Sequence, residues 1–499
     1  MIFPETRFAL PDFQPACAEI FVLFMICLIL MTSLFIKEKA RGTLHFLAQA
    51  ALIGAAALTC TASGAGTVKR AFSGMFVADM MADLLKLAIY LTISLTFFYS
   101  RAYVAGKLPR ARGEYYALTL IATLGMMVVV SAGNFVTLYV GLELLSLPIY
   151  ALVALERDSS RAAEAAMKYF VLGALASAFM LYGISMIYGA TGTLDISAVA
   201  EGFSRNRGDR ATAVFGLVFL VSGIAFKLGL APFHMWVPDV YHGAPLSVAL
   251  LISSAPKIAV FAFAVRVLIN GLFPLSQDWR AMLLALVVLS MALGNLAAIA
   301  QTNFRRMLAY SSISHMGFML LGLVSGVIDG NAKNMINAVS ASMFYLLTYV
   351  LSSAGAFGVL VLLPDPDGDS GEISGLAGLG KRSPVLAATM MTLMFSMAGI
   401  PFFAGFFAKF SVLVAVVAAG SFWLAALAVF FSLVGAYYYL RIVKVMYFDP
   451  LPDGARNIET PFSMKVLVAA NGLAVALLGI FPNALMFLCV KSLSFSVFA

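Results

Sequence analysis

The chain has 499 residues, of which 62% are apolar and 11% are charged, and its formal net charge is +8. A soluble domain is about 45–50% apolar and about 25% charged, so this composition excludes an ordinary soluble enzyme and indicates a membrane protein with many spans. Excess positive charge also occurs in nucleic-acid-binding proteins, so the positions of the cations must be compared with the spans.

Long hydrophobic runs divide the chain into fourteen candidate transmembrane helices. A helix needs about 20 apolar residues to cross a membrane, and these runs predict an all-α polytopic membrane protein. Two of the runs are interrupted: the seventh ends before Pro232, and the twelfth contains Gly399 and Pro401 in its middle. The fourteen runs are 16–36, 43–63, 74–100, 114–131, 133–155, 164–189, 212–231, 246–269, 280–301, 304–328, 335–363, 384–418, 421–447 and 464–489.

Lys and Arg residues are distributed unequally between the two sides of the predicted membrane. Loops that follow odd-numbered helices hold 17 of them, whereas the other loops and both tails hold 9. Because cytoplasmic loops carry the excess of Lys and Arg, this bias predicts that both termini lie on the outer (periplasmic) side. We expect a bacterial cell inner membrane, with an organelle inner membrane as the alternative. The positive charge is thus explained by topology and requires no nucleic acid.

The two interrupted helices lie five helices apart and each has a lysine near its break. Lys227 precedes Pro232 by five residues, and Lys409 follows Pro401 by eight. A repeat unit of five helices inserts with opposite orientation, and paired broken helices in two halves indicate a transport site. We therefore predict two inverted five-helix repeats, helices 4–8 and 9–13. The predicted segments are 1–113 for the first three helices, 114–270 and 271–450 for the repeats, and 451–499 for the last helix.

One acidic and one basic side chain lie at membrane depth in the first predicted repeat. Glu143 is in the fifth helix and Lys227 is in the seventh. Ionisable groups inside a membrane are costly and by default mark an ion pathway. A lysine can release its proton reversibly, and burial and a nearby carboxylate have opposite effects on its pKa. We therefore predict that Glu143 controls the proton affinity of Lys227, with a purely structural ion pair as the alternative.

Two further helices each carry a nitrogen base that follows two serines at a spacing of three and four residues. Residues at this spacing share one helix face, so each set would form a polar stripe. Such a stripe suits a hydrated proton path, and an imidazole, whose ordinary pKa is about 6.5, suits a relay. The alternative is packing between helices, where serine is common. The two sets are Ser253, Ser254 and Lys257 in the eighth helix, and Ser311, Ser312 and His315 in the tenth.

Three other groups of residues carry weaker expectations. Lys409 has no acidic residue in its own helix, so it is expected beside water or a partner from another helix, at one end of the path. His234 and Asp239 follow the break in the seventh helix and form either a channel mouth or a hydrogen-bonded turn. The tyrosines at 437–439 are expected to pack or to form an interfacial belt.

Asp79, Asp83 and Lys86 share one face of the third helix and are expected to satisfy one another. For this set we favour a structural or inter-subunit contact over transport.

Three segments of the sequence resemble one known family. The stretch KLGLAPFHMWVPDVYHGAP, which begins at Lys227, strongly resembles the signature of the antiporter-like subunits of respiratory complex I and of multisubunit cation/proton antiporters. LELLSLPIYAL around Glu143 and AGFFAKF around Lys409 are similar to the same family. The resemblance implies that Glu143 and Lys227 form a pair, that Lys257 links the two halves and that Lys409 ends the line. Lysine in both the eighth and the twelfth helix is similar to the subunit N branch rather than to the L and M branches.

The resemblance implies a proton-translocating subunit of NADH:quinone oxidoreductase without redox chemistry of its own. It implies that FMN, iron–sulfur clusters and the quinone site belong to other subunits, and that the partners are a neighbouring antiporter-like subunit, small membrane-arm subunits and the bilayer. The sequence contains no CxxC pair, Rossmann fingerprint or P-loop, so no cofactor or metal site is expected in this chain. Two alternatives stay open: a sodium/proton antiporter subunit without a redox partner, and a structural membrane-arm subunit without its own proton path.

Overall fold

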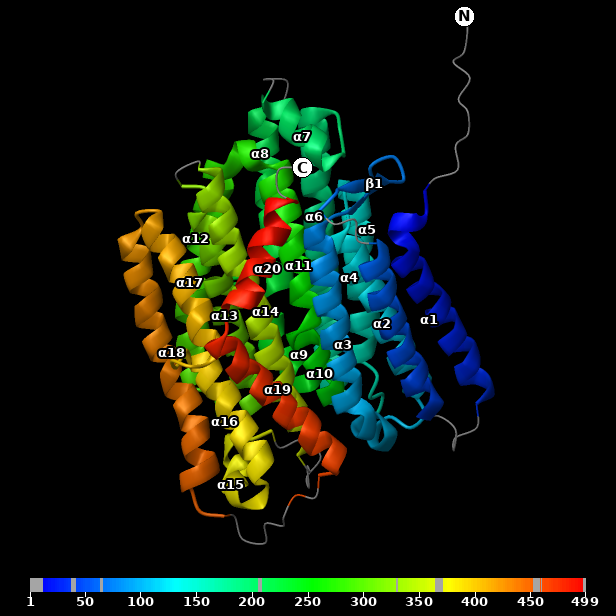
Figure 1. Ribbon diagram of the computed structural model, residues 1–499, viewed down its shortest axis with the longest axis vertical. Helices are drawn as coiled ribbons and strands as arrows, with labels where there is room; N and C mark the ends of the chain where they lie inside the picture. Colours follow the sequence, from blue (N-terminus) through cyan, green and yellow to red (C-terminus); the bar gives the residue numbers. More distant parts are fainter. Residues whose placement is uncertain are drawn as a thin grey trace, which may run out of the picture.

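The computed structural model describes residues 12–36, 42–62, 66–204, 209–328, 331–363, 371–451, 458 and 460–496. Within these residues the chain forms a bundle of long helices with one short β-hairpin (Figure 1). Thirteen helices of the described chain are long and apolar enough to cross a membrane, judged by length and composition. The predicted all-α polytopic fold is therefore confirmed, whereas the inverted relation of its two halves and the segment boundaries stay predictions.

The first half of the chain contains the hairpin and eight helices. Strands β1 and β2 pair antiparallel, with Arg70 opposite Val77. The elements are the 3-10 turn η1 (Gln14–Ala16), α1 (Cys17–Phe35), α2 (Gly42–Ala62), β1 (Lys69–Ala71), β2 (Phe76–Ala78), α3 (Met80–Lys107), α4 (Arg112–Val130), α5 (Phe135–Val153), α6 (Ser160–Thr191), α7 (Ile196–Ser204) and α8 (Arg210–Leu228).

The second half begins with the short helix that follows α8. Its elements are α9 (Trp236–Gly243), α10 (Leu246–Ser253), α11 (Ala255–Ala264), the π-helix η3 (Val265–Gly271), η4 (Phe273–Leu275), α12 (Ser276–Ile299), α13 (Phe304–Ser325), α14 (Ala332–Leu362), η5 (Ile373–Leu376), α15 (Leu379–Arg382), α16 (Pro384–Ala398), α17 (Ala404–Ala418), α18 (Phe422–Phe448), α19 (Phe462–Ile480) and α20 (Asn483–Ser494).

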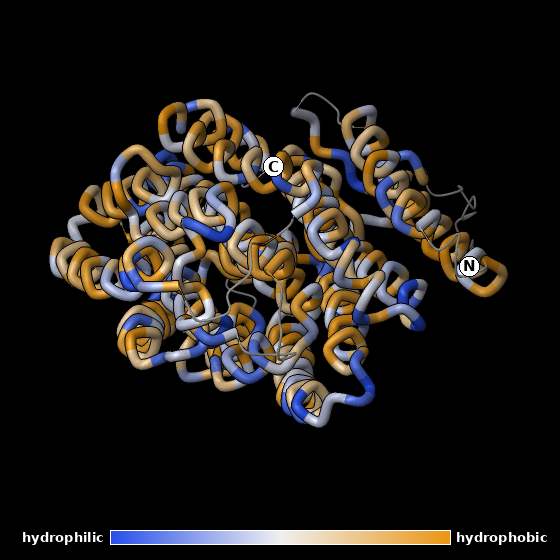
Figure 2. Tube along the Cα trace, turned by 90° about the horizontal axis from the view of Figure 1, so that it is seen from below, coloured by the Kyte–Doolittle hydropathy of each residue, from blue (hydrophilic) through white to orange (hydrophobic). Residues whose placement is uncertain are grey.

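Two spans occupy the centre of the bundle. The stretch 246–271 and helix α13 each bury 94% of their most apolar window, whereas α18 and α19 bury 33% and 28% of theirs. Hydrophobic residues are found on helices all round the bundle when it is viewed from one end (Figure 2). Apolar side chains are favoured where a helix faces lipid, so polar groups are expected inside the bundle rather than at its periphery. The two central spans are the ones that carry Lys257 and His315.

Both predicted helix breaks are present. Helix α8 ends at Leu228 and α16 ends at Ala398, and in each case the next residue is a glycine in the left-handed region, with φ of 73° at Gly229 and 89° at Gly399. Glycine terminates helices in this way because it adopts positive φ without a steric penalty. The chain then continues into α9 and α17, so both broken helices have a polar backbone turn between two segments.

A third break, which we did not predict, divides the eighth span. Helix α10 ends at Ser253 and α11 begins at Ala255, with the non-helical residue Ser254 between them. Pro256 explains this break, because proline lacks the N–H of a regular helix and its ring collides with the carbonyl four residues before. Lys257 therefore lies in the first turn of a new helix rather than in the middle of a continuous one.

Two predicted boundaries were wrong. The third span begins at Met80 and not at 74, because 69–78 form the hairpin and Asp79 caps the helix by accepting a hydrogen bond from the amide of Ala82 at 2.8 Å. The last run is divided into α19 and α20 around Pro482, which again cannot continue a helix. With α16 and α17 counted as one interrupted span, the thirteen long helices agree with the fourteen predicted runs.

Candidate functional site

Lys227 lies in the last turn of α8 and reaches α5 across the bundle. Its Nζ donates to Ser146 Oγ at 2.6 Å and to the hydroxyl of Tyr150 at 3.5 Å. Both partners follow Glu143 on α5, at three and seven residues, so all three lie on one helix face. One face of α5 therefore carries two hydroxyls that contact the Lys227 ammonium group. Glu143 lies on the same face, one turn before the first of them.

Glu143 is half-buried on α5 and is held by the neighbouring helix α6. Ser177 Oγ donates to Glu143 Oε1 at 2.5 Å. Among the described residues, no ion pair within 4.0 Å joins Glu143 to Lys227, and Ser146 lies on the face between them. The two side chains thus have separate hydroxyl partners, Ser177 for Glu143 and Ser146 for Lys227. Whether Glu143 controls Lys227 stays a prediction.

The segment after the break covers Lys227 with aromatic rings. Trp236 Nε1 donates to the carbonyl of Phe226 at 3.0 Å, in addition to the amide of Gly229, which donates to the same carbonyl at the end of α8. The same indole stacks on Tyr169, with ring centroids 4.5 Å apart, and Tyr169 in turn contacts Tyr150 at 4.6 Å. The tail that follows the break therefore closes one side of the Lys227 site.

Asp239 on α9 joins both halves of the protein. Its carboxylate accepts from Lys168 on α6 at 2.9 Å and from Arg306 on α13 at 3.0 Å. Partial burial opposes ionisation, but the hydrogen bonds from Lys168 and Arg306 outweigh it and lower the pKa of Asp239 below its ordinary value. Asp239 is thus bonded to two other helices, while the choice between a channel mouth and a hydrogen-bonded turn stays open. His234 is half-buried, and within the described structure its Nδ1 has no hydrogen-bond partner.

Lys257 is buried and is held by helices other than its own. Its Nζ donates to Ser312 Oγ on α13 at 2.7 Å and to the hydroxyl of Tyr349 on α14 at 3.1 Å. The polar stripe expected from Ser253 and Ser254 does not form, because the helix is broken between them and Lys257. Their hydroxyls instead donate to carbonyls of the preceding turn, 2.9 Å and 2.7 Å away.

His315 stands at the centre of a cluster of hydroxyls. Its Nδ1 lies 2.7 Å from the hydroxyl of Tyr345, and its Nε2 lies 2.8 Å from that of Tyr439. Ser311, on the same helix, hydrogen-bonds to the same Tyr439 hydroxyl. Of the tyrosines at 437–439, which were expected to pack or to form an interfacial belt, Tyr439 is buried and also hydrogen-bonds within this cluster, whereas Tyr437 is exposed.

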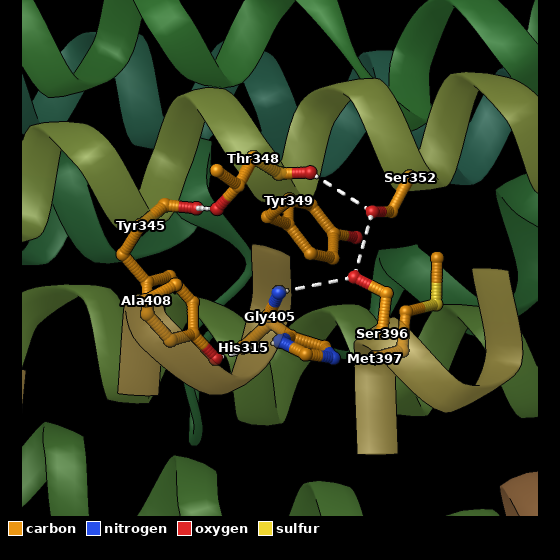
Figure 3. A pocket seen from close by; sticks show the side chains of 9 residues that line it. All are labelled: His315, Tyr345, Thr348, Tyr349, Ser352, Ser396, Met397, Gly405 and Ala408. Carbon is orange, nitrogen blue, oxygen red and sulfur yellow. Dashed lines mark hydrogen bonds between the residues drawn. The ribbon is translucent and has the colours of Figure 1, made fainter. Parts of the chain in front are cut away.

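A small cavity extends from His315 towards the break in the twelfth span (Figure 3). Its volume of about 10 Å³ is close to the space that one water molecule needs. On its far wall Ser352 and Ser396 hydroxyls lie 3.5 Å apart, and Ser396 Oγ accepts from the amide of Gly405 at 3.1 Å. The cavity therefore has polar groups from three helices between His315 and the half-helix that carries Lys409.

Lys409 is buried in α17 and is held at the break. Its Nζ donates to the carbonyl of Ala398, the last residue of α16, at 2.9 Å and to Ser432 Oγ on α18 at 2.9 Å. The ring of Phe318 lies 5.3 Å from the ammonium group, within the range of a cation–π contact. The partner from another helix that we expected for Lys409 is thus the end of α16 together with a serine.

Two members of the charged set at the third helix pair with residues outside the set. Lys86 pairs with Glu19 of α1 at 2.6 Å, and Asp79 pairs with Arg266 of η3 at 2.8 Å. Asp83 is half-buried on the same helix. The spacing along α3 identified a shared face, but the oppositely charged partners come from elements far away in sequence.

Several hydroxyl-bearing residues of the site were missed from the sequence. Ser146 carried a usable signal, because it lies one turn after Glu143. The others are single tyrosines or serines on other helices, and nothing in their local sequence separates them from packing residues. The missed residues are Ser146, Tyr150, Ser177, Tyr345, Tyr349, Ser352, Ser396, Ser432 and Tyr439.

Comparison with known sequences gives matches over almost the whole chain. Residues 132–435, more than half of the chain, match the family described as NADH:quinone oxidoreductase/Mrp antiporter, transmembrane region. The NADH-quinone oxidoreductase subunit N of Azoarcus sp. (strain BH72) is 53% identical over 97% of this chain and 98% of its own length. The subunit N of Nitrosomonas europaea is 51% identical over 98% of this chain and 100% of its own length.

Solved structures share the same fold. A chain in respiratory complex I from Thermus thermophilus, determined with bound aureothin, is 32% identical, with a TM-score of 0.79 over 94% of this chain and 98% of that one. A chain of the Mrp complex from Dietzia sp. DQ12-45-1b has a TM-score of 0.80 over 96% of this chain and 97% of that one. It is only 21% identical, so the likeness concerns the fold alone.

Proposed function

Since this chain belongs to the subunit N family of NADH-quinone oxidoreductase, we propose that it translocates protons in the membrane arm of that complex. Protons pass along a line of lysines formed by Lys227, Lys257 and Lys409. Glu143 sets the proton affinity at the start of this line, and the redox chemistry takes place in other subunits.

One observation carries the proposal. Lys257 and Lys409 are buried and Lys227 is half-buried, yet no carboxylate of the described chain lies within 4.0 Å of any of the three ammonium groups. Their partners are hydroxyls and one backbone carbonyl. A lysine that only stabilises a membrane fold is expected to be paired with a carboxylate, as Lys86 is with Glu19. Hydroxyl partners can instead both accept and donate a proton.

The contacts support an order for the proposed steps. Ser146 holds Lys227 against the α5 face that carries Glu143, one turn away, so a change in the charge of Glu143 acts on the lysine across this short distance. Lys257 contacts Tyr349, whose ring lies 4.8 Å from that of His315. His315 borders the cavity whose far wall is formed by Ser396 and Gly405, one turn before Lys409. A single water in this cavity would complete the connection between the centre and the twelfth span.

Magnitudes support a switch in proton affinity as the driving step. Moving one charge through a membrane potential of 100 mV represents about 2.3 kcal/mol. A difference of about two units in the pKa of a carrier between two states represents about 2.7 kcal/mol. Rearranging the hydrogen bonds around Lys227 can therefore supply the free energy for one transfer. The energy comes from quinone reduction elsewhere and arrives as an electrostatic or conformational change.

The proposal includes partners and location. The chain assembles with a neighbouring antiporter-like subunit and small membrane subunits in a bacterial inner membrane, with both termini on the outer side. FMN, the iron–sulfur clusters and the quinone site are carried by other subunits. This assignment follows from the relatives, which are subunits of an NADH-quinone oxidoreductase.

Proton-to-electron stoichiometry in the assembled complex tests the proposal. The complex carrying Lys227→Met, Lys257→Met or Lys409→Met is purified and reconstituted into vesicles, and the protons moved per NADH oxidised are measured. We expect each variant to assemble and to lose proton translocation or the turnover coupled to it. An unchanged stoichiometry and turnover in all three variants would refute the proposal and favour a purely structural subunit.

The pair of Lys86 and Glu19 supplies a matched control. Lys86→Met combined with Glu19→Gln removes another buried lysine together with its partner, away from the proposed line. We expect normal stoichiometry in this double variant. Purification of the chain in a cation/proton antiporter complex without flavin- and cluster-bearing subunits would instead support the antiporter alternative.

A further inference from the structure

Arg266 forms a buried ion pair that no part of the proton line uses. Its two terminal nitrogens donate to the two carboxylate oxygens of Asp79, at 2.8 and 3.0 Å. Both residues are 3% exposed. The same guanidinium donates from Nε and Nη2 to the carbonyl of Val130, at 3.2 and 3.0 Å. Two-pronged bonds of this kind fix orientation as well as distance.

The partners of Arg266 are the ends of two helices. Asp79 is the residue that caps the start of α3, and Val130 is the last residue of α4. A third contact comes from the C-terminal part of the chain, where the hydroxyl of Ser496 accepts from the amide of Met81 at 3.1 Å. Arg266 therefore connects η3 to a rigid junction of separate helices.

The helix segment that carries both Lys257 and Arg266 has irregular backbone on each side of its α-helical part. It begins after the break at Ser254, continues through the ten residues of α11 and passes into the π-helix η3. π-helical turns are rare and are frequent at functional sites. Lys257 lies in the first turn of this segment and Arg266 at the other end. The ten-residue helix α11 is too short to bend appreciably and Arg266 lies two residues beyond its end, so a restraint on Arg266 also restrains the direction of Lys257.

The junction adjoins a polar cavity of about 90 Å³, which is large enough for several waters. Asp79, Arg266 and Asn270 line it, and within the described chain the buried Oδ1 of Asn270 has no hydrogen-bond partner. Buried polar atoms of this kind are usually bonded to ordered water. The ion pair thus has hydrated space on one side, into which its side chains can rearrange.

We propose that Arg266, held by Asp79, is a positioning residue for Lys257. The pair fixes the rotation and axial position of the segment formed by α11 and η3, and thereby places the Lys257 ammonium group against Ser312 and Tyr349. The inference rests on the proposed role of Lys257 as a proton carrier. The new element is that proton transfer at Lys257 depends on the contact between Arg266 and Asp79. Asp79 caps the third helix and therefore lies outside the two predicted repeats.

Asp79→Asn is the most informative variant. Asparagine is as good a helix cap as aspartate, so the start of α3 is preserved while the charge on which Arg266 depends is removed. We expect the assembled complex to show proton-coupled turnover reduced by about tenfold to a hundredfold, the range in which misplacing a reacting group by about 1 Å falls. Arg266→Lys, which keeps the charge but only one contact point, is expected to restore part of the loss seen in Arg266→Gln.

Arg210→Gln is the matched control, because Arg210 forms a more exposed ion pair with Asp278 at 2.8 Å on α8 and α12. It is expected to leave turnover and stoichiometry unchanged. If Asp79→Asn and Arg266→Gln lower only the amount of complex, while each assembled complex transports protons normally, the pair is structural and the inference is overturned. Failure of the proposed function is a different result, namely normal proton transport in Lys257→Met.

Discussion

The ammonium group of Lys409 lies 2.9 Å from the carbonyl oxygen of Ala398, at the free end of α16. Carbonyls at the end of a helix lack intrahelical partners and carry partial negative charge, so they attract a cation. The break in the twelfth span thus supplies the partner that no carboxylate of the described chain supplies. A neutral carbonyl stabilises an ammonium group less strongly than a carboxylate does, which is consistent with the proposed role of Lys409 as a proton carrier.

Gly399→Ala is predicted to displace Lys409. Gly399 has φ of 89°, and an added Cβ would lie 2.9 Å from Cδ and 3.2 Å from Nζ of Lys409. We expect a loss of about 1 kcal/mol in stability from the strained backbone, together with a marked loss of proton-coupled turnover in the assembled complex.

Gly420→Ala separates these two effects. Gly420 also has positive φ, 76°, but an added Cβ would have no neighbour within 4 Å. It is predicted to show the stability loss without the loss of turnover. Equal activity of the two variants would contradict the proposed role of the Ala398 carbonyl at Lys409.

Ser146→Ala is predicted to uncouple Glu143 from Lys227. The variant removes the hydroxyl 2.6 Å from Nζ, and hydrogen bonds to charged groups are worth about 1.5–3 kcal/mol. We expect coupled turnover to fall by roughly one to two orders of magnitude, measured as NADH-driven proton uptake by vesicles. Ser222→Ala is the control, because this serine is on α8 near Lys227 but bonds to the carbonyl of Val218. A normal rate for Ser146→Ala would leave Glu143 without a structural link to the lysine.

Tyr439→Phe is predicted to disrupt the central cluster. The change removes the hydroxyl bonded to Ser311 and to His315 Nε2, and leaving a buried donor or acceptor unsatisfied costs about 1–3 kcal/mol. We expect a lower ratio of protons to electrons. Tyr437→Phe is the control, because this tyrosine lies on the same helix but is 60% exposed. A similar effect of both substitutions would indicate loss of packing rather than loss of a relay.

Asp239→Asn is predicted to weaken the junction without changing the pH profile of activity. The carboxyl has a lowered pKa in the folded protein, so its stabilising effect is present above the ordinary carboxyl pKa and is lost only as the pH falls through the lowered value. It stays ionised between about pH 6 and 9. Rates of the variant complex measured across this range should be reduced by one constant factor. A new pH dependence would mean that Asp239 itself titrates during turnover.

Arg266→Met is predicted to destabilise the protein by about 3–5 kcal/mol, because Asp79 is then buried without its partner. Arg210→Met removes a more exposed pair and should cost about 0–1 kcal/mol. Thermal denaturation of the detergent-solubilised complexes, followed by loss of the assembled form, compares the two. Equal midpoints would contradict the anchoring role of the ion pair at η3.

The sequence by itself determined the membrane class, the approximate spans and both glycine-terminated breaks. Hydrophobic run length and the special conformations of glycine and proline are local properties, which act the same way in any context. It also identified the three lysines, because a cation in an apolar run is conspicuous. Lys227 and Lys409 each lie only a few residues from a helix break in the sequence, so their position beside a polar turn could be predicted as well.

Only the tertiary structure decided which groups those lysines contact. Ser312 and Tyr349 reach Lys257 from helices 55 and 92 residues away in sequence, and Arg266 reaches Asp79 across 187 residues. The sequence around a hydroxyl or carboxyl side chain does not show which distant residue it will contact. A break of one helix turn also changes which residues share a helix face, as it does between Ser253 and Lys257. The chemistry of a lysine depends on the groups within a few ångströms of its ammonium nitrogen, and in this bundle the packing of the helices determines which groups those are.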